Sequence, residues 1–168
     1  EVEWSTIFFF IGLFISIGGT VKVGLIEMMS QKMIDLTGPT RDDMFVLPMV
    51  MVWFSAFASA IVDNIPFVAT MNPLLAGMAD KVLGGSGVEA LKHPTMLPVW
   101  WSLALGACLG GNGTAIGASA NVIVVGMSEK AGHKITFVRF MKYGIPVMLL
   151  TVALSMAYVW LRYYVLGW

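Results

Sequence analysis

The sequence predicts an all-α membrane protein, and three observations support this fold class. Hydrophobic residues make up 58% of the 168 residues and charged residues only 12%, whereas soluble domains carry about 25% charged residues. The mean hydropathy is +0.82. Residues 4–21, 98–128 and 143–161 each form a run without any charge, and about 20 apolar residues suffice for one bilayer-spanning helix. We therefore expect a multi-pass integral protein of the cell membrane.

The same composition argues against other classes of function. The net charge is zero and the pI is about 7.0, so nothing in the overall charge suggests a nucleic-acid partner. The single cysteine, Cys108, and the two histidines, His93 and His133, are far apart in sequence and predict no metal-ligand cluster. Aspartic proteolysis needs two neighbouring carboxylates, and only one lies deep in an apolar run. We expect no enzyme activity and no cofactor beyond a candidate Na⁺ ion.

The first two hydrophobic blocks predict a span and a hairpin. Residues 4–29 are expected to form one spanning helix, whose Gly18-Gly19 pair permits close approach of another helix. Residues 44–79 are expected to form a re-entrant helical hairpin broken at 63–66, where Asp, Asn and Pro interrupt the apolar run. Pro66 suits the first turn of the second half-helix, because its missing N–H would be unpaired there anyway.

The third and fourth blocks predict a discontinuous helix and a final span. Residues 98–128 are too long for one straight span and too short for two, and each of the three glycines at 110–114 weakens a helix by roughly 1 kcal/mol. We therefore expect this helix to break at 110–114. Residues 138–166 are predicted to form the last spanning helix, ending in an aromatic belt. The turn 129–142 holds four basic residues and is expected to be cytoplasmic.

Asp63 is the first candidate for a functional residue. It is the only charged side chain between Met44 and Ala79, and a carboxylate at membrane depth costs at least about 2.5–3.5 kcal/mol. Unwound backbone at that depth survives only inside protein or beside a wet cavity, and transporters use such breaks to bind ions. The predicted ion or substrate site comprises Asp63 and Asn64, which are candidate Na⁺ ligands, with Gly111, Asn112, Gly113, Thr114 and Asn121.

Helix geometry adds detail to this site. Thr114 is expected to cap the helix that resumes after the glycines, which permit positive φ. Ala118 and Asn121 would then share a helical face with Thr114, while Ser119 would point elsewhere. Structural alternatives stay open: Asp63 as a helix cap or a partner of Lys22, Asn64 as a cap, the glycine run as a packing kink, and Asn121 as a partner of a neighbouring helix.

Two stretches carry a resemblance to a known family. They are residues 59–70, SAIVDNIPFVAT, and 102–122, SLALGACLGGNGTAIGASANV. Both resemble the ion transporter superfamily with its citrate-transporter-like domain, specifically the branch of arsenite permeases, sodium–proton antiporters and P-protein-like permeases. The resemblance covers essentially all of the chain. It implies that 1–168 is the second, C-terminal repeat of a permease built from two inverted repeats, and the start Glu-Val-Glu-Trp agrees with a fragment or subunit.

The resemblance also implies a function. We expect a secondary active transporter that moves a small ion, oxyanion or metalloid by alternating access, driven by Na⁺ or H⁺. Arsenite or antimonite efflux and an ion channel are alternatives; citrate or dicarboxylate transport is less favoured, because Asp63-Asn64 replaces the Ser-Asn-Thr signature of that branch. The expected partners are the lipid bilayer, a small inorganic ion or anion, the missing N-terminal repeat and a second copy in a homodimer.

Overall fold

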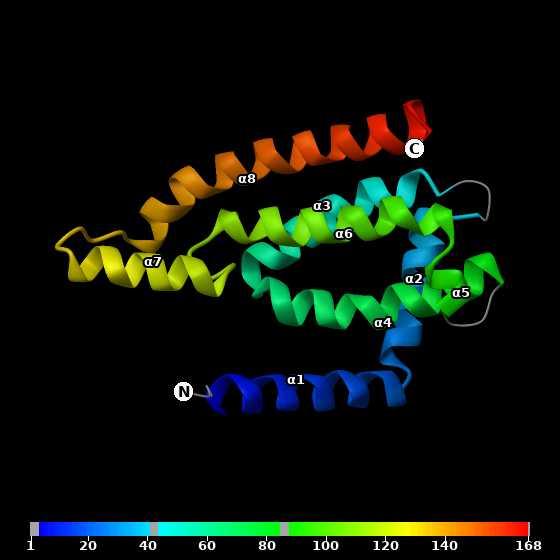
Figure 1. The fold of residues 1–168 in the computed structure, drawn as a ribbon, viewed down its shortest axis with the longest axis horizontal. Coiled ribbons are helices and arrows are strands. Elements are labelled where there is room, and N and C mark those ends of the chain that lie inside the picture. Colours follow the sequence, from blue (N-terminus) through cyan, green and yellow to red (C-terminus); the bar gives the residue numbers. More distant parts are fainter. Residues whose placement is uncertain (1–3, 41–43, 85–87, 168) are drawn as a thin grey trace.

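The computed structural model describes residues 4–40, 44–84 and 88–167, and every regular element among them is a helix (Figure 1). The predicted all-α class is thus confirmed for these residues. Residues 41–43 and the glycine-rich residues 85–87 lie outside them. In chain order the elements are α1 (Trp4–Lys22), α2 (Leu25–Thr37), α3 (Val46–Ile61), α4 (Asn64–Leu83), α5 (Val88–Leu91), η1 (Pro94–Met96), α6 (Leu97–Gly110), η2 (Gly111–Gly113), α7 (Ser119–Lys130), α8 (Phe137–Trp160) and η3 (Leu161–Val165).

The first hydrophobic block is divided into two helices, which corrects the prediction of a single helix over 4–29. α1 ends at Lys22, and α2 begins at Leu25 after Gly24, whose φ of 76° is left-handed. A non-glycine residue adopts this conformation rarely, so Gly24 ends the first helix. α2 then leaves α1 at a steep angle (Figure 1).

The second block forms a helical hairpin. α3 ends at Ile61, Val62 is extended with φ −115° and ψ 138°, and α4 starts at Asn64. The break therefore begins slightly before the predicted 63–66. α3 and α4 turn back on each other at this tip (Figure 1). Pro66 falls in the first turn of α4, where no backbone hydrogen bond is lost.

The third block breaks where predicted but resumes later. α6 ends at Gly110, the turn η2 covers 111–113, and Thr114 and Ala118 have extended backbone. α7 begins only at Ser119. The break thus covers 111–118 rather than 110–114, and the helical wheel assumed for residues after Thr114 does not apply.

Among the described helices, α3 and α6 make the most extensive contact, and their backbones approach closely. A Cβ atom built on Gly106 would lie 2.4 Å from the Val52 carbonyl oxygen, and one built on Gly110 would lie 2.3 Å from that of Ala56. Ser59 Oγ donates a hydrogen bond of 2.6 Å to the Ala107 carbonyl oxygen across the same contact. Small residues let the two backbones touch, as in membrane helix packing. The hairpin is thereby fixed against the broken helix.

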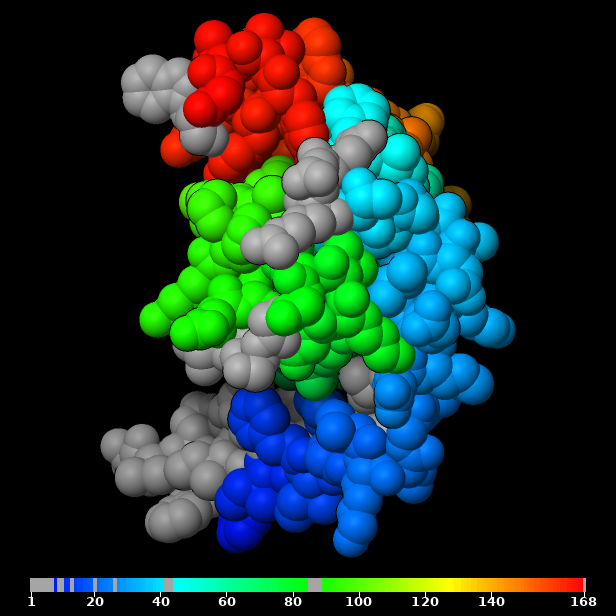
Figure 2. Space-filling view, turned by 90° about the vertical axis from the view of Figure 1, so that its right-hand side faces the viewer, coloured from blue at the N-terminus to red at the C-terminus, as the bar shows by residue number. Residues whose placement is uncertain are grey.

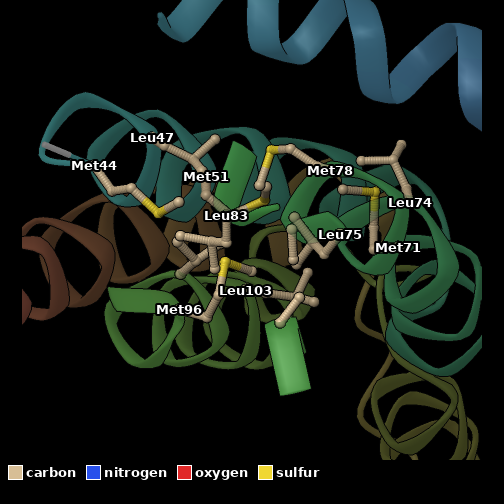
Figure 3. Packing of buried hydrophobic residues seen from close by; sticks show 13 residues of the cluster. Met44, Leu47, Met51, Met71, Leu74, Leu75, Met78, Leu83, Met96 and Leu103 are labelled. Atoms are coloured by element: carbon tan, nitrogen blue, oxygen red, sulfur yellow. The ribbon is translucent and has the colours of Figure 1, made fainter. Parts of the chain in front are cut away.

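The larger hydrophobic cluster lies between the hairpin and α6 (Figure 3). Five of its thirteen buried residues are methionines, whose unbranched side chains fill irregular gaps. The cluster comprises Met44, Leu47, Met51, Met71, Leu74, Leu75, Met78, Ala79, Leu83, Ala90, Met96, Val99 and Leu103.

Figure 2 views the molecule from the end that carries α5 and the C-terminal end of α8, away from the hairpin tip.

The last block is a long apolar helix. α8 covers Phe137–Trp160 and continues as the π-helical turn η3 to Val165, close to the predicted range 138–166. Among the described residues, Phe137–Val165 is the one helix that is long and apolar enough to cross a membrane, with a mean hydropathy of 1.9.

Candidate ion site at two helix breaks

The Asp63 carboxylate joins the hairpin tip to the start of α7. Its Oδ1 accepts a hydrogen bond of 3.1 Å from the Ile65 backbone N–H and so caps α4. Its Oδ2 accepts two hydrogen bonds from Ser119, 3.0 Å from the backbone N–H and 2.8 Å from Oγ. One carboxylate therefore lies at the N-termini of two helices, where the helix dipoles favour negative charge.

Ser119 is the residue that the sequence prediction missed. The Ser119 side chain was expected to point away from the site, because a helix running from Thr114 was assumed. Since Thr114–Ala118 is not helical, Ser119 becomes the first residue of α7 and faces Asp63 across 56 positions of sequence. No local signal marks this start, because Ala118 at the N-cap position has no side chain that could cap the helix.

Thr114 and Asn121 hold the break in place. Thr114 is buried, and its Oγ1 donates a short hydrogen bond to the Ala60 carbonyl oxygen at the end of α3. The Asn121 Nδ2 group donates to two carbonyl oxygens of the break, 2.8 Å to Gly111 and 3.1 Å to Thr114. Freed backbone oxygens are thus satisfied inside the protein, as backbone at membrane depth requires. Thr114 does not cap α7, contrary to the prediction.

The glycines of the break serve close packing. A Cβ atom on Gly111 would lie 2.9 Å from the Gly117 carbonyl oxygen, and one on Gly117 would lie 2.9 Å from that of Ser59. On the other side, a Cβ atom on Gly113 would lie 2.6 Å from Met148 Sδ. None of these three glycines has positive φ, which corrects the predicted reason for their presence. The break can lie against the hairpin tip because it has no side chains there.

The structure divides the predicted residues into three groups. Gly111, Thr114 and Asn121 are linked by hydrogen bonds, with Gly113 packed beside them against Met148. Asp63 instead bonds Ile65 and Ser119, and half-buried Asn64 follows it as the first residue of α4. Asn112 is exposed and instead lines a cavity of about 950 Å³ between the break, the end of α7 and α8.

Two structural alternatives can now be assessed. Asp63 does cap a helix, as one alternative held. The ion pairs found in the described part of the chain are Lys81–Glu27 and Lys134–Glu129, neither of which involves Asp63 or Lys22. No three His, Cys, Asp or Glu side chains gather into a metal-ligand group among the residues described.

An all-helical, strongly apolar chain with a long apolar helix and two broken ones fits the class of integral membrane proteins. Comparison with known proteins gives the family. Residues 1–106 match the citrate transporter family, and the chain belongs to it.

Three relatives illustrate the match. The chain is 44% identical over 99% of its length to an uncharacterized transporter of Mycobacterium tuberculosis. It is 40% identical over its full length to the P protein of Mus musculus and 39% identical over 99% to a 46 kDa membrane protein of Mycobacterium leprae. It spans 36% of the length of each mycobacterial relative and 19% of the mouse protein. No solved structure matches the chain significantly.

Proposed function

We propose that this chain forms one repeat of a secondary active transporter that couples transport to Na⁺ or H⁺, with Asp63 as the cation-binding group. The observation that carries the proposal is the double capping by Asp63. A cation here would have the Asp63 carboxylate as its charged ligand. The end of α3 and the unwound residues 111–118 are the candidate sources of the backbone carbonyl oxygens with which discontinuous transporter helices hold Na⁺. The missing repeat, supplied by the rest of a longer chain or by a second copy, would complete the site.

Charge balance suggests how coupling could arise. Each helix start carries roughly +0.5 elementary charge, so the starts of α4 and α7 together offset one carboxylate. Na⁺ or H⁺ on Asp63 would cancel its charge and leave both helix starts able to attract an anion. Cation binding and anion binding would then favour each other, as alternating-access cotransport requires.

The transported substrate has two leading candidates. The family description supports an organic anion such as citrate. The hairpin tip supports the arsenite or antimonite alternative instead, because Asp63 repels an approaching anion whenever no cation is bound to it. An ion channel is the alternative to a secondary transporter as the transport mechanism, and flux that does not saturate with substrate would distinguish it.

The test is uptake into proteoliposomes that contain the full-length protein carrying this sequence. Imposed Na⁺ and pH gradients would be applied separately, with radiolabelled citrate and arsenite as substrates. The wild type is expected to respond to one gradient with saturable uptake, while Asp63→Asn loses that dependence. Asp35→Asn, which alters an exposed carboxylate on α2, is the matched control and should behave as the wild type.

Two outcomes contradict the proposal. Unchanged gradient dependence in Asp63→Asn would show that the carboxylate does not bind the coupling cation. Uptake that rises linearly with substrate would point to a channel rather than a secondary transporter.

A further inference from the structure

A cavity borders the helix break at Asn112, away from the residues that bond Asp63. The cavity of about 950 Å³ opens between the break, the connection 131–136 and the first half of α8. Figure 1 shows this connection folding back from the end of α7 towards the start of α8. Cavities of roughly 300–1,000 Å³ suit small organic ligands. The lining comprises Asn112, Ser128, Gly132, His133, Lys134, Ile135, Arg139, Phe140, Tyr143, Gly144 and Val147.

The charge of this lining is of one sign. Lys134 and Arg139 are cationic, and none of the lining residues is a carboxylate. Glu129 contacts Lys134 at 3.9 Å, but both side chains are largely exposed, so the pair is weak. Neither ion pair of the described residues involves Arg139. The guanidinium is thus available to bind a carboxylate or phosphate through two parallel hydrogen bonds.

Hydrogen bonds to backbone groups hold the turn 128–136 that carries Lys134 and the start of α8 that carries Arg139. Ser128 Oγ donates a hydrogen bond of 2.7 Å to the His133 carbonyl oxygen, and the His133 N–H donates one of 2.9 Å to the Ser128 carbonyl oxygen. Gly132 supplies the left-handed residue with φ 84°. Thr136 Oγ1 accepts a hydrogen bond of 3.3 Å from the Arg139 backbone N–H and so caps α8. These contacts fix the two ends of the cation-bearing segment, so that Lys134 and Arg139 line the same cavity.

We infer that this cavity binds a small anion with two or more negative charges on carboxylate or phosphate groups. The inference rests on the proposed function, because Asn112 connects the cavity to the helix break and gives a transported anion a waiting position beside it. A free anion and an anionic lipid headgroup share this chemistry, so both must be tested.

The test measures binding to the purified full-length protein by isothermal titration. The probes are citrate, inorganic phosphate and, in a separate arm, nanodiscs with or without phosphatidylglycerol. Arg139→Gln and Lys134→Gln should each weaken binding by about tenfold, the loss expected for one charge-assisted hydrogen bond. Lys142→Gln changes an exposed cation of the same segment that does not line the cavity and should bind as the wild type.

The controls separate this inference from the proposed function. Asp63→Asn should abolish cation-driven uptake yet keep anion binding, whereas Arg139→Gln should lose binding and remain monodisperse on size exclusion. Arg139→Lys, which keeps the charge but not the planar fork, should fall between wild type and Arg139→Gln. The inference is overturned if none of the probes binds, or if Lys142→Gln weakens binding as much as Arg139→Gln.

Discussion

At the scale of single residues, Asp63 shows how a carboxylate is accommodated in an apolar run. It accepts three hydrogen bonds, all from the first residues of α4 and α7. Each charge-assisted bond contributes about 1.5–3 kcal/mol, which is enough together to offset the roughly 2.5–3.5 kcal/mol cost of the charge. The residue is therefore both a structural cap and the proposed cation ligand, and these roles must compete whenever a cation binds.

This double role predicts a non-additive pair of substitutions. Ser119→Ala removes one hydrogen bond to Asp63 Oδ2 and should lower the thermal midpoint of the detergent-solubilised protein. In an Asp63→Ala background the same change should have little effect, because its partner is already gone. Residues that share an interaction typically show coupling of about 0.5–3 kcal/mol. Midpoint shifts that simply add would mean that the contact contributes nothing to stability.

Thr114 offers a second residue-scale prediction. Thr114→Val keeps the side-chain shape but leaves the Ala60 carbonyl oxygen without its donor, so it should destabilise the protein by about 1–3 kcal/mol. Thr114→Ser keeps the hydroxyl and should lose much less. Thermal unfolding of the two variants side by side checks this, and equal losses would assign the role of Thr114 to its methyl group.

At the scale of elements, the contact of α3 with α6 determines where the two breaks meet. Gly110→Ala would drive a methyl group into the Ala56 backbone and should destabilise by about 1–3 kcal/mol or more. Gly126→Ala in α7 meets no atom within 4 Å and should stabilise by up to about 1 kcal/mol through helix propensity. Thermal midpoints that fall alike in both variants would indicate a general intolerance of alanine.

The elements also show which features the sequence could predict. Local signals located both breaks, since Asp63-Asn64-Ile65-Pro66 and the run of glycines disfavour continuous helix wherever they occur. The late start of α7 had no comparable signal. Thr114–Ala118 stays non-helical because Thr114 bonds Ala60 and Gly117 packs on Ser59, contacts that arise only when distant segments meet. Likewise, the α1–α2 bend depends on Gly24 rather than on the Gly18-Gly19 pair, although all three are glycines.

At the scale of the whole molecule, the predicted orientation follows from α8 and its flanking charges. The apolar stretch Phe137–Val165 begins beside the basic turn 129–142, and Lys and Arg near a span favour the cytoplasmic side. The connection 80–95, at the far end of α6, is then expected outside. The 950 Å³ cavity would open towards the cytoplasm and meet the anions of the cell interior.

Cysteine labelling in intact cells tests this orientation. In a Cys108→Ala background, which removes the native exposed thiol, Lys134→Cys should react with a membrane-impermeant maleimide only after the cells are opened. Lys92→Cys, an exposed residue of the 80–95 connection, should react from outside without opening. Labelling of both positions from one side would mean that α6, its break and α7 do not carry the chain across the bilayer. The reverse labelling pattern would place the basic turn outside, and the cavity would then meet extracellular anions.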